Sequence, residues 1–296
     1  MWRQLSVAAD EAQTEWLSDQ FFELGALSVS FQDEGDQPLF EPKPGEIPLW
    51  RKTRVIALFE EEVDLSQVRS AICDSFAAGS LVDWHEEEIQ DRAWERAWLD
   101  HFKPMQFGRR LWIVPTGFEL PKQEGVVCVN LDPGLAFGTG THPTTALCLQ
   151  WLDSQELQGK TVLDFGCGSG ILTIAALLLG AQKAVATDID PQALTATIDN
   201  ARKNGVEEKV DCYLPSRMPK LKADLLLANI LANPLIELAG QLADTIRPAG
   251  TIVLSGILRE QADAVISAYE AHFAMEEPVY LEDWVRLDGV RRSGQK

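Results

Sequence analysis

Apolar positions in the first 90 residues switch between the two-residue period of strands and the period of three to four residues that is typical of helices. The pattern predicts strands and helices in the order β-α-β-β-α-β. Asp64 is the expected cap of the second helix. The expected strands cover residues 2–8, 27–31, 54–60 and 80–89, and the expected helices cover residues 10–24 and 64–77.

This order matches the ferredoxin-like split βαβ motif, an architecture that hosts many unrelated functions. Residues 91–101 follow as an acidic helix, in which Trp94 and Trp98 lie four positions apart and therefore share a face. These two rings either pack between domains or form a stripe that binds a partner. We therefore predict a small α+β domain over residues 1–90 and a linker helix over residues 91–105.

From residue 106 onward, strand and helix patterns alternate, which is typical of a mostly parallel α/β sheet. Asp190-Pro191 has the form of a capped helix start. The sequence thus predicts an α/β domain over residues 106–296. Its expected strands cover residues 161–164, 183–188, 209–213, 223–228 and 250–256, and its expected helices cover residues 171–179, 191–204 and 233–246.

The chain has 296 residues, of which 46% are hydrophobic and 24% charged, the balance of a globular protein. No apolar run approaches the ~18–20 residues of a membrane span, and the N-terminus has no apolar core of signal-peptide type. We therefore expect a cytoplasmic protein with no membrane partner. The five cysteines are scattered, which predicts reduced, mostly buried thiols, and the four histidines do not cluster, so no metal site is expected.

The formal net charge of −19 is unevenly distributed along the chain. Residues 1–105 hold 9 basic and 22 acidic residues, whereas residues 106–296 hold 17 and 23. So acidic a surface repels nucleic-acid phosphates, and no direct nucleic-acid binding is expected. The acidic excess of residues 1–105 has two interpretations, a role in solubility or a docking surface for a basic protein. Considered without other evidence, the charge favours the solubility interpretation.

The strongest local signal is segment 162–170, Val-Leu-Asp-Phe-Gly-Cys-Gly-Ser-Gly, in which a short strand turns through three glycines into an apolar helix. Glycines let a backbone approach a ligand closely, and a helix N-terminus favours polar groups nearby. The spacing differs from the G-x-G-x-x-G of dinucleotide-binding proteins. Asp164, two residues before the first glycine, would repel a pyrophosphate and suits a cationic part of a ligand.

Asp188 ends the next predicted strand, 18 residues after Gly170. A carboxylate at the tip of the second strand of a βαβ unit can accept both hydroxyls of an adenosine ribose. The alternative role is a helix cap, which fits Asp190 better. Together, the glycine segment and Asp188 resemble the class I methyltransferases, whose fold is a Rossmann-like, mostly parallel α/β sheet and whose cofactor is S-adenosylmethionine.

Residues 131–145 are dense in glycine, threonine and proline, and predict a ligand-covering loop that leads into a helix from Ala146. Thr144 or Thr145 is the expected cap of that helix. His142 is either a base or a structural residue of a tight turn.

The segment Asn229-Ile230-Leu231-Ala232 follows a predicted strand, at the edge where open α/β sheets bind ligands. Amide and carbonyl groups there can hold an amine and direct its lone pair at a methyl group. Asn233-Pro234 then fits a turn or a helix start.

Segments 131–145, 165–170 and 229–232, together with Asp188, resemble the bacterial family of methyltransferases that modify the eleventh protein of the large ribosomal subunit. The resemblance extends over nearly the whole chain, because the N-terminal unit and the linker helix also fit. The loop and the Asn-Ile-Leu-Ala segment are the specific motifs. Relatives that methylate amide or adenine nitrogens carry Asn-Pro-Pro-Tyr or similar, which argues against those substrates.

The resemblance implies methylation of the N-terminal α-amine and of lysine ε-amines of that basic ribosomal protein, with S-adenosylmethionine as the cofactor. It also implies that the N-terminal domain grips the substrate, and a basic substrate strengthens the docking interpretation of the acidic first part. By carry-over, the cofactor would be bound by Thr145, Gly166, Asp188 and Asn229, with Phe137, Thr139 and Gly168 in the same pocket.

A sulfonium is already a good electrophile, so direct transfer requires no metal, no covalent intermediate and no dedicated catalytic base. Two other functions stay open: a class I methyltransferase for another basic protein, a nucleic acid or a small molecule, and a non-catalytic module with a relic cofactor pocket. The acidic surface counts against nucleic acid and the extra domain counts against a small metabolite. The intact glycine segment, Asp188 and Asn229 count against a relic.

Overall fold

The computed structural model of the chain describes residues 2–35, 50–75, 81–89, 103–118, 125–132 and 142–293. The chain divides into two compact units, residues 1–97 and 98–296. Most of the predicted linker helix, with Trp94 and Trp98, lies outside the described residues. None of the described helices has the length and hydropathy that crossing a membrane requires.

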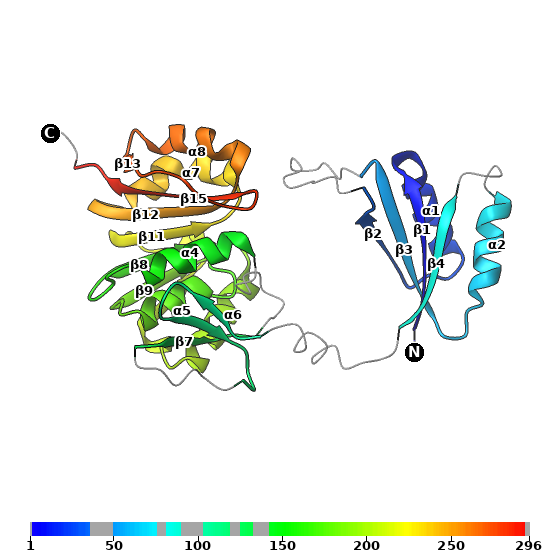
Figure 1. The fold of residues 1–296 in the computed structure, drawn as a ribbon, viewed down its shortest axis with the longest axis horizontal. Helices are drawn as coiled ribbons and strands as arrows, with labels where there is room; N and C mark the ends of the chain where they lie inside the picture. The colour runs from blue at the N-terminus through cyan, green and yellow to red at the C-terminus, as the bar shows by residue number, and fades with distance from the viewer. Residues whose placement is uncertain are drawn as a thin grey trace. The chain divides into compact units, whose positions relative to one another are not determined.

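The first unit is an antiparallel sheet with the strand order β2-β3-β1-β4 (Figure 1). The predicted β-α-β-β-α-β order is confirmed, and the Asp64 carboxylate accepts the Ser66 N–H at 3.0 Å, as expected of the cap. Alternate residues of the central strands form a core with the two helices. The strands are β1 (Trp2–Asp10), β2 (Ser28–Asp33), β3 (Lys52–Glu60) and β4 (Val82–Ile89), and the helices are α1 (Glu11–Glu23) and α2 (Leu65–Ser75).

Strand β4 forms one edge of this sheet and carries three consecutive exposed acids, Glu86, Glu87 and Glu88. An edge strand leaves backbone groups available for pairing with another chain, and charged side chains discourage such pairing. Part of the acidic excess of the first unit is therefore gathered on one edge strand of the described sheet.

The second unit contains an eight-stranded, mostly parallel sheet in the order β10-β9-β8-β11-β12-β15-β13, with β14 paired to β15 (Figure 1). The predicted mostly parallel α/β sheet is confirmed. The parallel strands are β8 (Thr161–Phe165), β9 (Lys183–Thr187), β10 (Val210–Tyr213), β11 (Ala223–Asn229) and β12 (Ile246–Leu258). The antiparallel strands, which the sequence did not predict, are β13 (Phe273–Met275), β14 (Val279–Leu281) and β15 (Trp284–Arg291).

Helices bury both faces of this sheet. The faces are covered by α4 (Pro143–Asp153), α5 (Ile171–Leu178) and α6 (Pro191–Lys203) on one side, and by α7 (Ala232–Asp244) and α8 (Ala262–Tyr269) on the other. In β11, Leu225 and Leu227 face the first group, whereas Leu226 and Ala228 face the second. Burial on both faces explains why residues 225–228 of this strand form a continuous apolar run.

Strand β8 pairs with β9 on one side and with β11 on the other. The chain therefore leaves β8 in one direction across the sheet and later returns to its opposite side. Such a switch point opens a crevice beyond the carboxyl ends of the strands, where open α/β sheets bind ligands.

A small three-stranded sheet at the start of the second unit was not predicted, because its strands are only three or four residues long: β5 (Met105–Phe107), β6 (Leu111–Val114) and β7 (Val127–Asn130). Asp153, the last residue of α4, holds the β5–β6 turn in place through hydrogen bonds. Its carboxylate accepts three backbone N–H groups, from Arg109 at 2.6 Å, Arg110 at 3.2 Å and Leu111 at 3.0 Å. Gly108 has a φ of 74°, and a Cβ there would overlap this carboxylate.

We expect Asp153→Ala to lower the free energy of unfolding of the second unit by about 2–3 kcal/mol, because the buried Leu111 N–H and the neighbouring N–H groups lose a charged acceptor. Asp199→Ala is the matched control. It removes an exposed carboxylate that pairs with Arg202 at 2.8 Å on the helix surface, and should cost less than about 0.5 kcal/mol. Urea unfolding followed by circular dichroism measures both; equal midpoints for the two variants would contradict the role given to Asp153.

Candidate functional site

The glycine segment forms the turn between β8 and α5 at the switch point. Gly166 and Gly168 have φ values of 82° and 54°, a region that residues with a Cβ rarely adopt. At Gly166 a Cβ would also overlap the Cγ2 methyl of Ile230. The turn is fixed to the neighbouring strand, since the Gly166 and Cys167 N–H groups donate to the Thr187 carbonyl at 2.7 and 3.1 Å.

Asp188 lies directly beyond β9 and contacts this turn. One carboxylate oxygen accepts the Gly168 N–H at 2.9 Å, and the other accepts the Asp190 N–H at 3.0 Å. Each oxygen keeps a further lone pair for a ligand hydroxyl. Asp190 caps α6 by accepting the Gln192 N–H, as predicted.

Thr145 and Asn229 meet from separate elements. Thr145 is in the first turn of α4 and is 2% exposed, and Asn229 is the last residue of β11. The Asn229 amide nitrogen donates to the Thr145 hydroxyl at 3.2 Å. The amide oxygen of Asn229 is then the group left to accept a hydrogen bond from a ligand.

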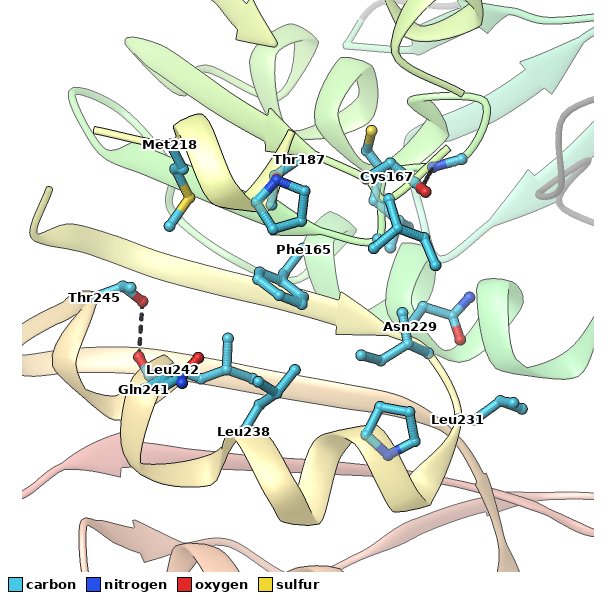
Figure 2. A pocket seen from close by; sticks show the side chains of 18 of the residues that line it. Phe165, Cys167, Thr187, Met218, Asn229, Leu231, Leu238, Gln241, Leu242 and Thr245 are labelled. Carbon is cyan, nitrogen blue, oxygen red and sulfur yellow. Dashed lines mark hydrogen bonds between the residues drawn. The ribbon is translucent and has the colours of Figure 1, made fainter. Parts of the chain in front are cut away.

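These side chains line one cavity of about 600 Å³ between the carboxyl ends of the strands and helix α7 (Figure 2). The cavity brings together five of the seven residues predicted to bind a cofactor: Thr145, Gly166, Gly168, Asp188 and Asn229. The other two, Phe137 and Thr139, lie outside the described residues.

Asp164 is 1% exposed and is absent from the cavity lining. One carboxylate oxygen accepts the N–H and the hydroxyl of Thr173, at 3.1 and 2.6 Å, whereas the other has no hydrogen-bond partner among the described residues. The pKa of this carboxyl is raised to about 6, chiefly by burial and in smaller part by the negative charge of Asp188, while the Thr173 hydrogen bonds oppose the rise. A buried, half-satisfied acid therefore lies two residues before the glycine turn.

The predicted threonine cap of α4 is wrong, because the helix begins one turn earlier. His142 is the capping residue, and its Nδ1 accepts the Thr144 N–H at 3.4 Å. The imidazole also packs edge-on against Trp284 at 4.7 Å between ring centroids, and burial lowers its pKa. His142 therefore has a structural role as the cap of α4, and its alternative role as a base stays a prediction.

All five cysteines are free, as predicted, but their burial varies: Cys148 and Cys167 are buried and Cys73 is exposed. Burial raises the pKa of the Cys148 thiol to about 12, so it is protonated at neutral pH and is no nucleophile. Within the described residues no group of three or more histidine, cysteine or acidic side chains is placed to hold a metal ion.

The sequence did not point to several apolar residues that line the cavity. Ile189 follows Asp188 and is 85% exposed, which is unusual for so large an apolar side chain. Its position directly after Asp188, the acid that follows β9, was the sequence signal that could have identified Ile189 as a cavity residue. Met218, Leu238 and Leu242 also line the cavity, and for the two leucines the helical spacing is the same as that of ordinary core positions.

The sequence profile of one protein family, "Ribosomal protein L11 methyltransferase (PrmA)", matches residues 1–292. A ribosomal protein L11 methyltransferase of Methylococcus capsulatus is 59% identical over 294 residues, which cover 99% of this chain and 100% of that protein. A protein of the same name from Pseudomonas aeruginosa is 54% identical over 293 residues, with 99% of both chains covered.

Among solved structures, a ribosomal protein L11 methylase of Lactobacillus delbrueckii subsp. bulgaricus superposes with a TM-score of 0.57 at 33% identity. The match covers 65% of this chain and 99% of that chain.

We expect Gly166→Ala to destabilise the second unit by about 2–4 kcal/mol, because it adds steric overlap with Ile230 to the cost of a positive φ. Gly159→Ala is the control, since Gly159 has a similar φ of 74° and no atom within 4 Å of an added Cβ. The double variant Gly166→Ala/Ile230→Ala should recover part of the loss. Thermal unfolding compares the three; if Gly166→Ala costs no more than Gly159→Ala, the close packing of the turn is refuted.

Proposed function

This chain belongs to the family of ribosomal protein L11 methyltransferases, and we propose that it methylates amino groups of protein L11, the N-terminal α-amine and lysine ε-amines. It is an S-adenosylmethionine-dependent methyltransferase. The observation that carries the proposal is the cavity in which the glycine turn, bonded to Asp188, faces the Thr145–Asn229 pair.

The residues of the cavity fit S-adenosylmethionine. Asp188 has free lone pairs for two ribose hydroxyls, and the exposed Ile189 side chain beside it can cover the apolar face of a base. One oxygen of Asp164 has no partner in the part of the chain that the structure describes, and this buried negative charge near the glycine turn favours a cationic ligand over an anionic one. We therefore assign cofactor binding to Thr145, Gly166, Gly168, Asp188 and Asn229, while Phe137 and Thr139 stay predictions.

The bound cofactor supplies an electrophilic methyl group on a sulfonium, so the protein has mainly to position the amine. Asn229 can accept an N–H of the target amine through its amide oxygen, because its amide nitrogen already donates to Thr145. An amine held this way keeps its lone pair free for the methyl group. Desolvation and the nearby sulfonium charge both lower the pKa of the amine, which favours its neutral, nucleophilic form.

We propose residues 1–90 as the domain that recognises the substrate, residues 91–105 as a linker and residues 106–296 as the catalytic domain, acting in the cytoplasm. The net charge of −13 in residues 1–105 and the exposed acids of β4 are complementary to a basic protein. The same charge disfavours direct binding to nucleic acid.

We expect cofactor affinity to fall as the pH is lowered through about 6, where Asp164 takes up a proton and its favourable charge is lost. Because its pKa is raised from 3.8 to about 6 in the folded protein, the ionised form is present above that range and is lost below it. Calorimetric titration of S-adenosylmethionine, which carries the cationic sulfonium, between pH 5 and 8 measures the effect.

Asp164→Asn should bind with a pH-independent affinity, near that of the wild-type protein at low pH. Asp188→Ala is the contrasting variant and should lower affinity at least about tenfold across the whole range, because it removes the ribose acceptor. A pH profile of Asp164→Asn identical to that of the wild-type protein would exclude Asp164 as the titrating group.

Intact-mass spectrometry of purified L11, incubated with this protein and S-adenosylmethionine, tests the proposed substrate. We expect increments of about 14 Da per methyl group, mapped to the α-amine and to lysines. Asn229→Ala should slow these increments at least about tenfold at saturating cofactor, through lost positioning. No mass change in L11, with cofactor binding intact, would remove L11 as the substrate and favour another basic protein or a small molecule.

A further inference from the structure

The cavity continues well beyond the residues assigned to the cofactor. Helix α7, with its C-cap residue, contributes a stripe of lining residues at helical spacing: Pro234, Leu238, Gln241, Leu242 and the cap Thr245. At 1.5 Å per residue this stripe is about 16 Å long. Figure 2 shows Asn229 and Leu231 at one end of the cavity, and Met218 and Thr245 at the other.

The far end of the cavity lies at the amino ends of the strands, whereas the ligand crevice lies at their carboxyl ends. The carbonyl of Thr245 accepts the Ala223 N–H at 2.7 Å, and Ile246 begins β12. Thr245 is therefore beside the first residues of β11 and β12, whereas Asn229 is the last residue of β11. A cofactor bound beyond the carboxyl ends of the strands leaves this end of the cavity unexplained.

A missing helix explains why the cavity extends so far. The connections from β8 to β9, from β9 to β10 and from β11 to β12 carry helices of 8, 13 and 13 residues. The connection from β10 to β11 carries only a 3₁₀ turn of three residues, Pro215–Arg217. The side chains of Phe165 and Thr187, neighbours in register on β8 and β9, line the cavity where a helix would otherwise pack.

We call this extension the apolar arm and define it by Phe165, Thr187, Met218, Leu238, Gln241 and Leu242. Four of the six side chains are apolar. The Thr187 hydroxyl is fully buried and has no hydrogen-bond partner among the described residues. Gln241 is exposed, so the arm opens to solvent at its far end.

We propose that the apolar arm is a binding site for apolar groups carried on the base of an adenosyl ligand. The proposal rests on the proposed placement of the ribose at Asp188. Thr187, a residue of the arm, directly precedes Asp188 and Ile189 in the chain, and Ile189 and Pro215 line the same cavity as the arm, so a base beside Ile189 would lie close to the arm. The ligand class is adenosyl compounds with an aryl or alkyl substituent on the base.

Calorimetric titration of the full chain with three probes tests the proposal: S-adenosylhomocysteine, its derivative with a benzyl group on the exocyclic nitrogen of adenine, and its derivative with a benzyl group at C8. We expect one of the two derivatives to bind at least tenfold more tightly than the parent compound. If neither binds more tightly, the apolar arm is no ligand site. If the parent itself fails to bind, the proposed cofactor site fails first.

Leu238→Trp fills the arm and should abolish the gain shown by the derivative, while the parent keeps its affinity within twofold. Gln241→Trp makes the same block from an exposed position and covers the case in which Leu238→Trp does not fold. Glu237→Trp is the matched control, an exposed α7 residue outside the cavity lining that should change neither affinity. A tenfold gain that survives both Leu238→Trp and Gln241→Trp would overturn the assignment to the arm.

Discussion

The hydrogen bond from the Gly168 N–H to the Asp188 carboxylate is the constraint on which the site depends. It joins the turn after β8 to the turn after β9, and the two bonds to the Thr187 carbonyl fix the same turn beside it. Ile230 can then approach Gly166 because that residue has no side chain. The ends of three neighbouring strands thus share one arrangement, in which a ligand meets groups that are already oriented.

Two aspartates in this region show how environment separates their roles. Asp188 is bonded to two backbone N–H groups and faces the cavity, so it remains an acceptor for hydroxyls. Asp164 is buried, one of its oxygens has no partner among the residues that the structure describes, and its pKa is raised to about 6. In the cofactor site we propose, the first would provide directional hydrogen bonds and the second would provide charge without direct contact. The same side chain would then serve recognition in one position and electrostatics in the other.

The main architecture, and the part of the cavity formed by the glycine turn and Asp188, could be predicted from the sequence because both depend on local patterns. Apolar periodicity identified β8 to β12 with their helices, and the glycine turn and Asp188 follow their strands directly. What could not be predicted depends on contacts between distant segments. The strands of the small sheet are too short for periodicity, and His142 displaced the threonines as a cap because it also packs on Trp284, over a hundred residues away. The apolar arm exists because the connection from β10 to β11 lacks a helix. No residue pattern in the sequence predicts the cavity that this missing helix leaves.

Helix α4 reaches the site at one end and the small sheet at the other. Thr145 in its first turn meets Asn229, and Asp153 at its last position holds the β5–β6 turn. The helix is about 16 Å long. The small sheet therefore anchors the C-terminal end of the helix whose N-terminal end carries Thr145, and it belongs to the same structural unit. For anyone building chimaeras from members of this family, the exchangeable unit therefore starts before β5. A junction between the small sheet and α4 would place the β5–β6 turn of one protein against the Asp153 carboxylate of another, although that carboxylate is positioned for the turn of its own chain.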